Sequence, residues 1–291
     1  QGPYILQPIM ARALRVSGNF LRLISAPFSG GSFGLKQSIY PYIVLLAAAS
    51  RISGLPLKWT EDRLEHLMAS SSAADRADEL EAAFTSDGTL LGLRFKNCVN
   101  VGAYVRAPEP ASVYRMHAAS NGCYAVKNIS IQNKLVSTNK MPVGLNRGYG
   151  GPQFYYGLER MMDLTARKLN IDTAEIRRKN FIPEDQFPYH APAGAIYDSG
   201  NYSEALDLLL KLSNYENIKR RRKQARAAGK LFGIGMGAGV EPSGSNMAYV
   251  TLAQTAEERK RAGGRSGGTA VASVTIDPTG AVSVNLDSTP A

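Results

Sequence analysis

The chain has 291 residues, of which 44% are hydrophobic, and carries a formal net charge of +10. This composition supplies ample apolar surface for about two packed domains. The longest apolar stretch, residues 42–49, is too short to cross a membrane, and residues 1–4 lack a signal-peptide pattern. The two cysteines, Cys98 and Cys123, are too few for a disulfide framework or an iron–sulfur cluster, so we expect a reducing, cytoplasmic compartment.

Periodicity and turn signals predict an α+β chain with mixed sheets and packed helices. A strand-like run over residues 21–26 and a helix-like run over 38–49 come first. A short strand over 56–59 is followed by a short helix over 60–68, and residues 70–74 have the composition of a mobile loop.

A hairpin is predicted next, with strands over residues 79–85 and 89–99 joined at Asp87-Gly88. Asp-Gly between two alternating runs is a strong signal for a tight hairpin turn. A further strand is expected over residues 126–138.

Helices dominate the following part. One is predicted over residues 153–169 after Pro152, and another begins near Asp172, where Asp-x-x-Glu resembles a capping box. Helices over 203–212 and 217–228 come next, followed by a strand-rich part over 231–287.

These elements suggest a first unit over residues 1–218, a basic connecting segment over 219–230 and the start of a second unit over 231–291. The Lys-Arg-Arg-Arg-Lys run at 219–223 could bind phosphate nonspecifically. No stacking aromatic residues interleave with it, so the solvated face of a helix is favoured and nucleic-acid binding is not expected. The positive charge instead favours an acidic partner subunit, and the charged, glycine-rich residues 257–268 are expected to be mobile.

Two glycine-rich loops are the strongest functional signal. Residues 30–36 read Gly-Gly-Ser-Phe-Gly-Leu-Lys between a strand-like and a helix-like run, and residues 146–153 read Asn-Arg-Gly-Tyr-Gly-Gly-Pro-Gln before a helix. Glycine permits positive φ and a close approach of the backbone to a ligand, while the first amides of a helix favour anions. The spacing fits neither a Walker nor a Rossmann loop. The pair predicts a site for a phosphorylated cofactor, although each loop alone could be a structural turn.

Together with Ala-Glu-Ile-Arg-Arg-Lys-Asn-Phe at residues 174–181, these loops resemble the molybdenum-binding large subunit of the xanthine dehydrogenase, aldehyde oxidase and carbon monoxide dehydrogenase family. The resemblance runs from Gln1 to about Asp287 and implies the molybdopterin-binding large-subunit fold. It also implies a molybdenum pyranopterin, as molybdopterin or its cytosine dinucleotide form, that hydroxylates an N-heterocycle or an aldehyde with oxygen from water. Electrons would pass to 2Fe-2S clusters and FAD on partner chains or domains.

The resemblance carries residue roles with it. The expected cofactor contacts are Gln1, Gly31, Ser32, Phe33, Gly34, Arg147 and Gly148, of which Gln1, Phe33 and Arg147 would touch the ligands of molybdenum. For Gln1, a plain exposed terminal residue is the alternative. Ser32 stands where the family commonly has glycine, so the turn is expected to be slightly altered.

The expected substrate contacts are Gln37, Arg115 and Tyr149. Gln37 stands where xanthine dehydrogenases carry a glutamate, and a neutral amide cannot serve as the carboxylate partner of a ring nitrogen, so purine oxidation is disfavoured. Arg115 is retained, and Tyr149 could stack on a flat substrate. The alternatives are an Arg115 pair with Glu109 on a surface loop and core packing of Tyr149.

The catalytic glutamate of the family and a further Gly-Gln-Gly loop are expected beyond the end of this chain. The chain is therefore expected to be an incomplete part of a larger complex, with no catalytic residue of its own. The carbon monoxide dehydrogenase branch carries a copper-bound cysteine where residues 146–151 have none, which disfavours that activity. The alternatives are a carbon monoxide dehydrogenase-like large subunit and a noncatalytic assembly subunit that completes a site made by another chain.

Overall fold

The computed structural model describes residues 3–24, 30–31, 33–34, 40–73, 75–106, 113, 115–241, 257 and 272–286. The described helices are α1 (Pro3–Leu14), α2 (Tyr40–Ser53), α3 (Arg63–Ala69), α5 (Gly151–Leu169), α6 (Thr173–Asn180), α7 (Tyr202–Leu212) and α8 (Tyr215–Ala227), with 3₁₀ turns at Gly18–Phe20 and Glu184–Gln186. The described strands are β1 (Asp75–Phe84), β2 (Leu90–Asn100), β3 (Asn128–Val136), β4 (Tyr189–His190), β5 (Ile196–Tyr197), β6 (Ala272–Ile276) and β7 (Val282–Leu286). None of the described helices is both long and apolar enough to span a membrane.

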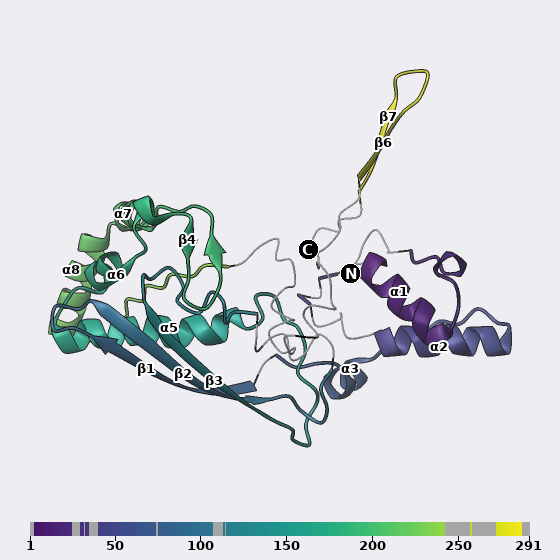
Figure 1. Ribbon diagram of the computed structural model, residues 1–291, viewed down its shortest axis with the longest axis horizontal. Helices are drawn as coiled ribbons and strands as arrows, with labels where there is room; N and C mark the ends of the chain where they lie inside the picture. The colour runs from purple at the N-terminus through teal and green to yellow at the C-terminus, as the bar shows by residue number, and fades with distance from the viewer. Residues whose placement is uncertain are drawn as a thin grey trace.

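A three-stranded sheet in the order β1–β2–β3 forms the centre of the larger body (Figure 1). The predicted hairpin is confirmed: β1 and β2 run antiparallel, with Asp75 opposite Asn100. The predicted third strand is also present, but it pairs parallel to β2, with Gly92 opposite Asn128. A parallel neighbour requires a crossover connection, which the segment between β2 and β3 supplies.

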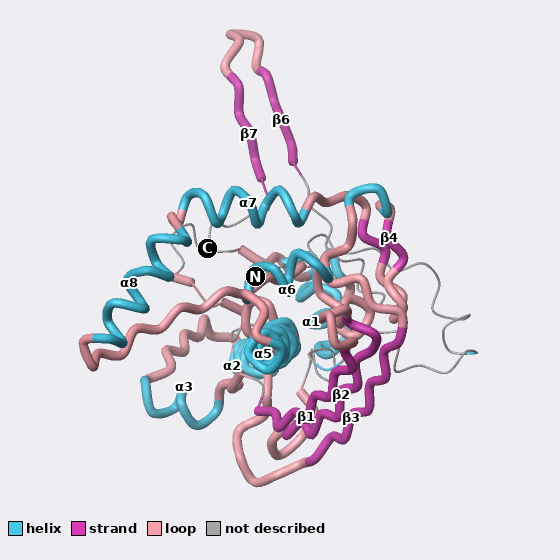
Figure 2. The backbone as a smooth tube through the Cα atoms, turned by 90° about the vertical axis from the view of Figure 1, so that its left-hand side faces the viewer, coloured by secondary structure: helices cyan, strands magenta, loops and turns pink. Residues whose placement is uncertain are grey.

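The main core lies between this sheet and α5. Figure 2 shows α5 end-on, with the strands on one side and α6 on the other. One face of α5 buries Phe154, Leu158 and Met162 at helical spacing, as expected for an amphipathic helix. The ring of Phe154 packs 5.0 Å from that of Phe95 on the alternating buried face of β2.

Asn180, at the end of α6, anchors the β1–β2 turn. Its Oδ1 accepts a hydrogen bond from the amide of Leu90 at 2.7 Å, and its Nδ2 donates to the carbonyls of Gly88 and Ile176, both at 2.8 Å. The side chain is 3% exposed, so these bonds replace the water that a buried amide would lose. This part of the 174–181 motif therefore stabilises the fold.

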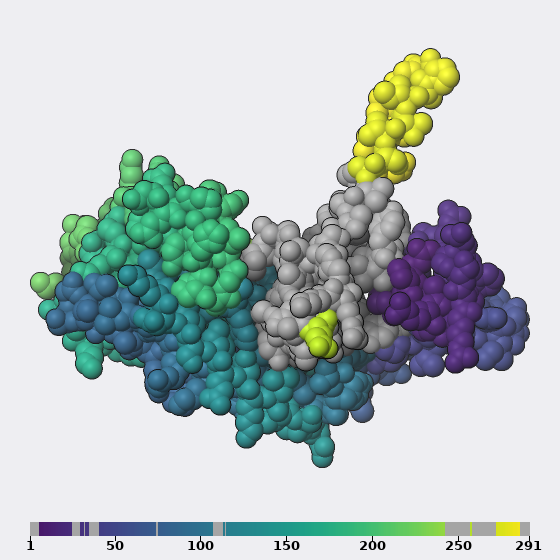
Figure 3. All heavy atoms as spheres, in the orientation of Figure 1, coloured from purple at the N-terminus to yellow at the C-terminus, as the bar shows by residue number. Residues whose placement is uncertain are grey.

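Helices α6 to α8 and the β4–β5 pair lie at one end of the structure, and α1 and α2 lie at the other (Figure 1). The β6–β7 hairpin stands clear of both (Figure 3). In α8, Lys219 lies 3.4 Å from Asp172, and Arg221 lies 5.4 Å from the ring centre of Phe232. Two cations of the basic run thus make contacts within the fold.

Two predicted strands are wrong. Residues 21–24, the described part of the first, form no strand; the carbonyl of Leu21 accepts a hydrogen bond at 2.9 Å from Gln7 on the unpredicted helix α1. Residues 56–59 also form none, and Trp59 instead packs against Tyr42, with ring centres 5.2 Å apart.

Three further expectations need correction. In the predicted mobile loop over 70–74, of which residues 70–73 are described, Ser72 forms a β-bridge with Val143. Asp172 caps α6 through the amide of Ala174 at 2.8 Å without completing a capping box. In the expected strand-rich part over 231–287, the described strands are β6 and β7, and residues 231–241 are irregular. Residues 258–268 lie outside the described residues.

Candidate functional site

The two glycine-rich loops meet in space. The amide of Arg147 donates a hydrogen bond to the carbonyl of Phe33 at 2.6 Å. The Arg147 guanidinium also lies over the Phe33 ring, 5.0 Å from its centre, which is a cation–π distance. Phe33 and Arg147 were predicted as cofactor contacts from two motifs that lie far apart in the sequence. In the structure the two residues contact each other.

Gly34 makes this contact sterically possible. Its φ is +103°, and Phe33 before it also has a positive φ of 51°. A Cβ added to Gly34 would lie 1.9 Å from Cδ2 and 3.0 Å from the carbonyl oxygen of Leu145, just before the second loop. Only glycine fits both the backbone conformation and the space at this position.

The second loop shapes the start of α5. Gly148 and Gly150 have φ values of +77° and +82°, and the amide of Gly151 donates to the carbonyl of Gly148 at 2.8 Å. The N-terminus of α5 therefore lies in the second loop, beside the meeting point of the loops, where the helix dipole favours negative charge. Gln153, in the first turn, buries its Oε1, and none of the described residues donates a hydrogen bond to that atom.

Arg115 and Tyr149, two of the predicted substrate residues, are also brought together. Arg115 Nη1 donates to the Tyr149 carbonyl at 3.1 Å, and the guanidinium lies 4.8 Å from the centre of the Tyr149 ring. Arg115 Nη2 forms an ion pair with Glu241. The pair expected as an alternative, with Glu109, falls on a residue outside the described ones. Tyr149 packs on Arg115 beside the loops.

Residues 236–241, which we call the strap, pass along α5 and bring Glu241 to Arg115. The strap is tied to α5 at two points: Glu159 accepts a hydrogen bond from the amide of Ala238 at 3.0 Å, and the Tyr155 hydroxyl donates to the carbonyl of Val240. A Cβ on Gly239 would lie 3.3 Å from the Tyr155 ring, so this glycine permits the close approach.

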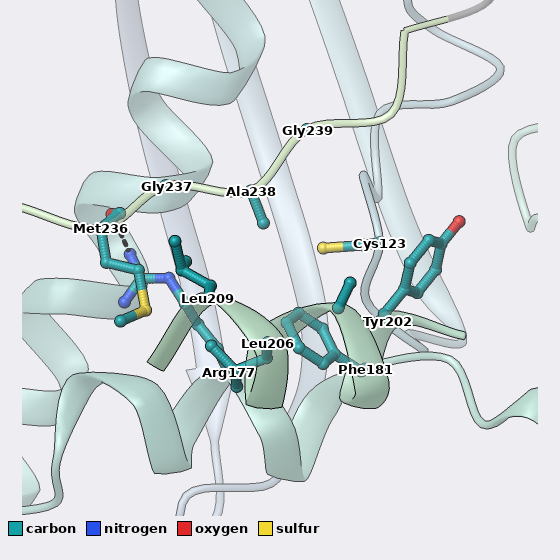
Figure 4. A pocket seen from close by; sticks show the side chains of 11 residues that line it. Cys123, Arg177, Phe181, Tyr202, Leu206, Leu209, Met236, Gly237, Ala238 and Gly239 are labelled. Atoms are coloured by element: carbon teal, nitrogen blue, oxygen red, sulfur yellow. Dashed lines mark hydrogen bonds between the residues drawn. The ribbon is translucent and has the colours of Figure 1, made fainter. Parts of the chain in front are cut away.

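Arg177 on α6 is the buried anchor of this arrangement. Its side chain is 1% exposed and pairs with Glu159 at 2.8 Å and with Asp163 at 3.0 Å. Its Nη2 also donates to the carbonyl of Met236 on the strap at 3.0 Å (Figure 4). The guanidinium thus connects α5, α6 and the strap, and its charge is fully compensated.

A cavity of about 220 Å³ lies between the strap and helices α6 and α7 (Figure 4). Apolar groups line much of it, including Phe181, Leu206 and Leu209. Burial raises the pKa of the Cys123 thiol in its wall, so the thiol stays protonated and is a poor nucleophile. The candidate site is therefore placed at the two glycine-rich loops and not in this cavity.

His117 lies under the site and is held neutral. Asn133 Nδ2 lies 3.1 Å from His117 Nε2, and Asn133 Oδ1 accepts a hydrogen bond from Asn97 Nδ2 at 2.8 Å, so His117 Nε2 is the acceptor. Burial, followed by the nearby positive charge of Arg76, lowers the pKa of His117 to about 4. An ionised His117 would be unfavourable here.

This depressed pKa predicts acid sensitivity. In the unfolded chain His117 has the ordinary histidine pKa of 6.5, whereas in the folded chain its pKa is about 4, so stability is lost as the pH falls between these values. After a discount for partial exposure, we expect a contribution of about 2 kcal/mol. Urea unfolding at pH 7 and pH 4.5 should show a smaller loss in His117→Gln than in the wild type. Equal losses would contradict a buried neutral histidine.

The remaining predicted residues divide by position. Gln1, Ser32 and Gln37 lie outside the described residues. Gly31, next to the Phe33 ring, and Gly148 lie in the two loops that meet. Sequence reasoning missed the role of Glu241, which comes just after the alternating glycines at residues 233–239. The signal in the sequence that could have indicated this residue is the alternating glycine pattern followed by a single carboxylate.

Comparison with known proteins gives the family of this chain. Residues 1–181 match the family described as the molybdopterin cofactor-binding domain. The carbon monoxide dehydrogenase large chain of Hydrogenophaga pseudoflava is 36% identical over 243 residues, which cover 81% of this chain and 30% of that protein. The nicotine 6-hydroxylase large subunit of Paenarthrobacter nicotinovorans is 34% identical over 226 residues, with 77% and 28% covered.

The fold is that of the solved relatives. The crystal structure of quinoline 2-oxidoreductase from Pseudomonas putida 86 matches with a TM-score of 0.84 at 29% identity, over 98% of this chain and 35% of that one. The expected α+β large-subunit fold is thereby confirmed. The chain spans about three tenths of the length of the curated relatives it matches. The family model, the relatives and the meeting of the two loops together show that this chain belongs to the molybdopterin cofactor-binding domain family.

Proposed function

We propose that this chain is the cofactor-binding part of a molybdenum hydroxylase that oxidises an N-heterocycle or an aldehyde, with water as the oxygen source. The contact between Phe33 and Arg147 carries the proposal, because it joins the two loops at one point beside Arg115 and Tyr149. Similarity to proteins named for nicotine and quinoline, both N-heterocycles, supports the substrate class.

The residues at this point suit a pyranopterin. Gln153 offers a buried acceptor that lacks a donor among the described residues, and the ring nitrogens of a pterin are suitable donors. Gly34 and Gly148 let the backbone approach a flat group. We assign cofactor contacts to Gln1, Gly31, Ser32, Phe33, Gly34, Arg147 and Gly148, with Gln1, Phe33 and Arg147 nearest the ligands of molybdenum.

When bound, the molybdenum pyranopterin supplies the redox centre that oxidises the substrate carbon. The residues of this chain position the substrate. Tyr149 offers an aromatic face, Arg115 offers a fixed guanidinium, and Gln37 is proposed to complete the substrate wall. We further propose that the general base lies in the remainder of the large subunit, and that 2Fe-2S and FAD partners accept the electrons in the cytoplasm.

The test uses the intact native complex with all of its partner chains. We expect about one molybdenum per large subunit by mass spectrometry, iron–sulfur bands in the visible spectrum, and substrate-dependent dye reduction with heterocycles or aldehydes. Carbon monoxide is included among the tested substrates. If the complex oxidised carbon monoxide and none of the heterocycles or aldehydes, the proposed substrate class would be wrong. A complete complex without molybdenum would refute the enzyme assignment. Molybdenum whose retention is independent of this chain's loops would indicate an assembly subunit.

A further inference from the structure

The ion pair between Arg115 and Glu241 changes the chemistry expected of the proposed substrate wall. The Arg115 side chain is only 9% exposed, while that of Glu241 is 53% exposed. A nearly buried guanidinium without a counter-ion would favour an anionic ligand, because arginine binds carboxylates in a planar, two-point geometry. Here the Glu241 carboxylate of the same chain forms an ion pair with the Arg115 guanidinium.

The position of Glu241 is determined by its surroundings. The Oε2 atom of Glu241 would lie 3.4 Å from a Cβ added to Gly151. The carboxylate therefore lies next to Gly151, the first residue of α5. The positive end of a helix dipole stabilises a carboxylate at that position. The charge of Glu241 is thus compensated from two sides, by Arg115 and by the start of α5.

The strap delivers Glu241 to that seat. The preceding residue, Val240, is bound through its carbonyl to the Tyr155 hydroxyl, and Ala238 and Met236 are bound to the buried Glu159 and Arg177. Three successive anchors on alternate residues limit the freedom of the backbone just before Glu241. This reduces the entropy that the ion pair would otherwise cost.

We propose that Glu241 is a positioning residue for specificity: it neutralises Arg115 internally, so that the substrate wall admits uncharged substrates and rejects carboxylates. This rests on the proposed function, in which Arg115 and Tyr149 face the substrate. In the proposed site, Arg115 and Glu241 then present a neutral pair to the substrate. The substrate class is therefore an uncharged heterocycle or aldehyde.

A binding experiment that needs no turnover tests the charge balance. Benzoate and benzamide have nearly the same shape and differ in charge, so calorimetry on the intact complex compares them directly. In Glu241→Gln we expect benzoate to bind about tenfold more tightly and benzamide to change by less than about twofold. In an Arg115→Gln background, the same Glu241→Gln change should have no effect on benzoate. The matched control is Glu81→Gln on β1, which removes the carboxylate that pairs with Arg94. This variant should change the binding of neither ligand.

A kinetic experiment tests whether the Arg115–Glu241 ion pair controls selectivity between charged and uncharged substrates. With 4-formylbenzoate and 4-formylbenzamide as aldehyde substrates, Glu241→Gln should lower KM for the anion about tenfold and leave kcat nearly unchanged. Unchanged benzoate binding in Glu241→Gln, or tightening that persists without Arg115, would overturn the inference. Absence of turnover with either aldehyde would count against the proposed function, while the calorimetry would still decide the role of Glu241.

Discussion

Replacing Arg177 by methionine is expected to lower the free energy of unfolding by about 3–5 kcal/mol. The guanidinium is buried and paired with Glu159 at 2.8 Å and Asp163 at 3.0 Å. Methionine fills part of the volume but leaves the Glu159 carboxylate, which is 12% exposed, without its cation. Urea denaturation followed by circular dichroism measures the difference from the wild type.

The neighbouring arginine provides the control. Arg178 is paired with Asp207 at 2.6 Å, but that carboxylate is 64% exposed, so Arg178→Met should cost no more than about 1 kcal/mol. Glu159→Gln in the Arg177→Met background should recover part of the loss, because no buried charge remains unpaired. Equal effects of Arg177→Met and Arg178→Met would show that the buried network contributes little.

Substitution of Gly34 by alanine is expected to abolish most cofactor retention. The added Cβ would lie 1.9 Å from Leu145 Cδ2 in a backbone conformation with φ of +103°, so the first loop must move. We expect a cost of about 2 kcal/mol or more, and movement here separates Phe33 from the amide of Arg147. Molybdenum content per large subunit of the purified complex is the direct measurement.

Gly30 offers a matched control within the same loop. A Cβ at Gly30 meets no atom of the described residues within 4 Å, and the φ of Gly30 lies outside the left-handed range. Gly30→Ala should therefore retain molybdenum at the wild-type level. Full retention in Gly34→Ala, with the complex otherwise intact, would mean that the loop contact is not part of the cofactor site.

Local signals in the sequence were sufficient for several elements. Asp87-Gly88 predicted the turn of the β1–β2 hairpin because glycine there adopts a φ of +88°. The apolar spacing of α5 and the proline after its glycine cluster predicted a helix that the structure confirms over Gly151–Leu169. The apolar patterns at residues 21–24 and 56–59 were misleading, because a short apolar run does not by itself specify a strand, and neither range pairs with another described segment.

The sequence by itself determined the described helices other than α1, the hairpin, the two glycine-rich loops and the family, because each depends on a short pattern of residues or on backbone conformations that only glycine tolerates. Tertiary packing determined the parallel pairing of β3, the contact of Phe33 with Arg147, and the choice of Glu241 as the partner of Arg115. These contacts join residues far apart in the chain, and sequence spacing does not specify which distant charges or loops meet. The position of the strap, which brings Glu241 to Arg115, follows from its hydrogen bonds to Glu159 on α5 and to buried Arg177.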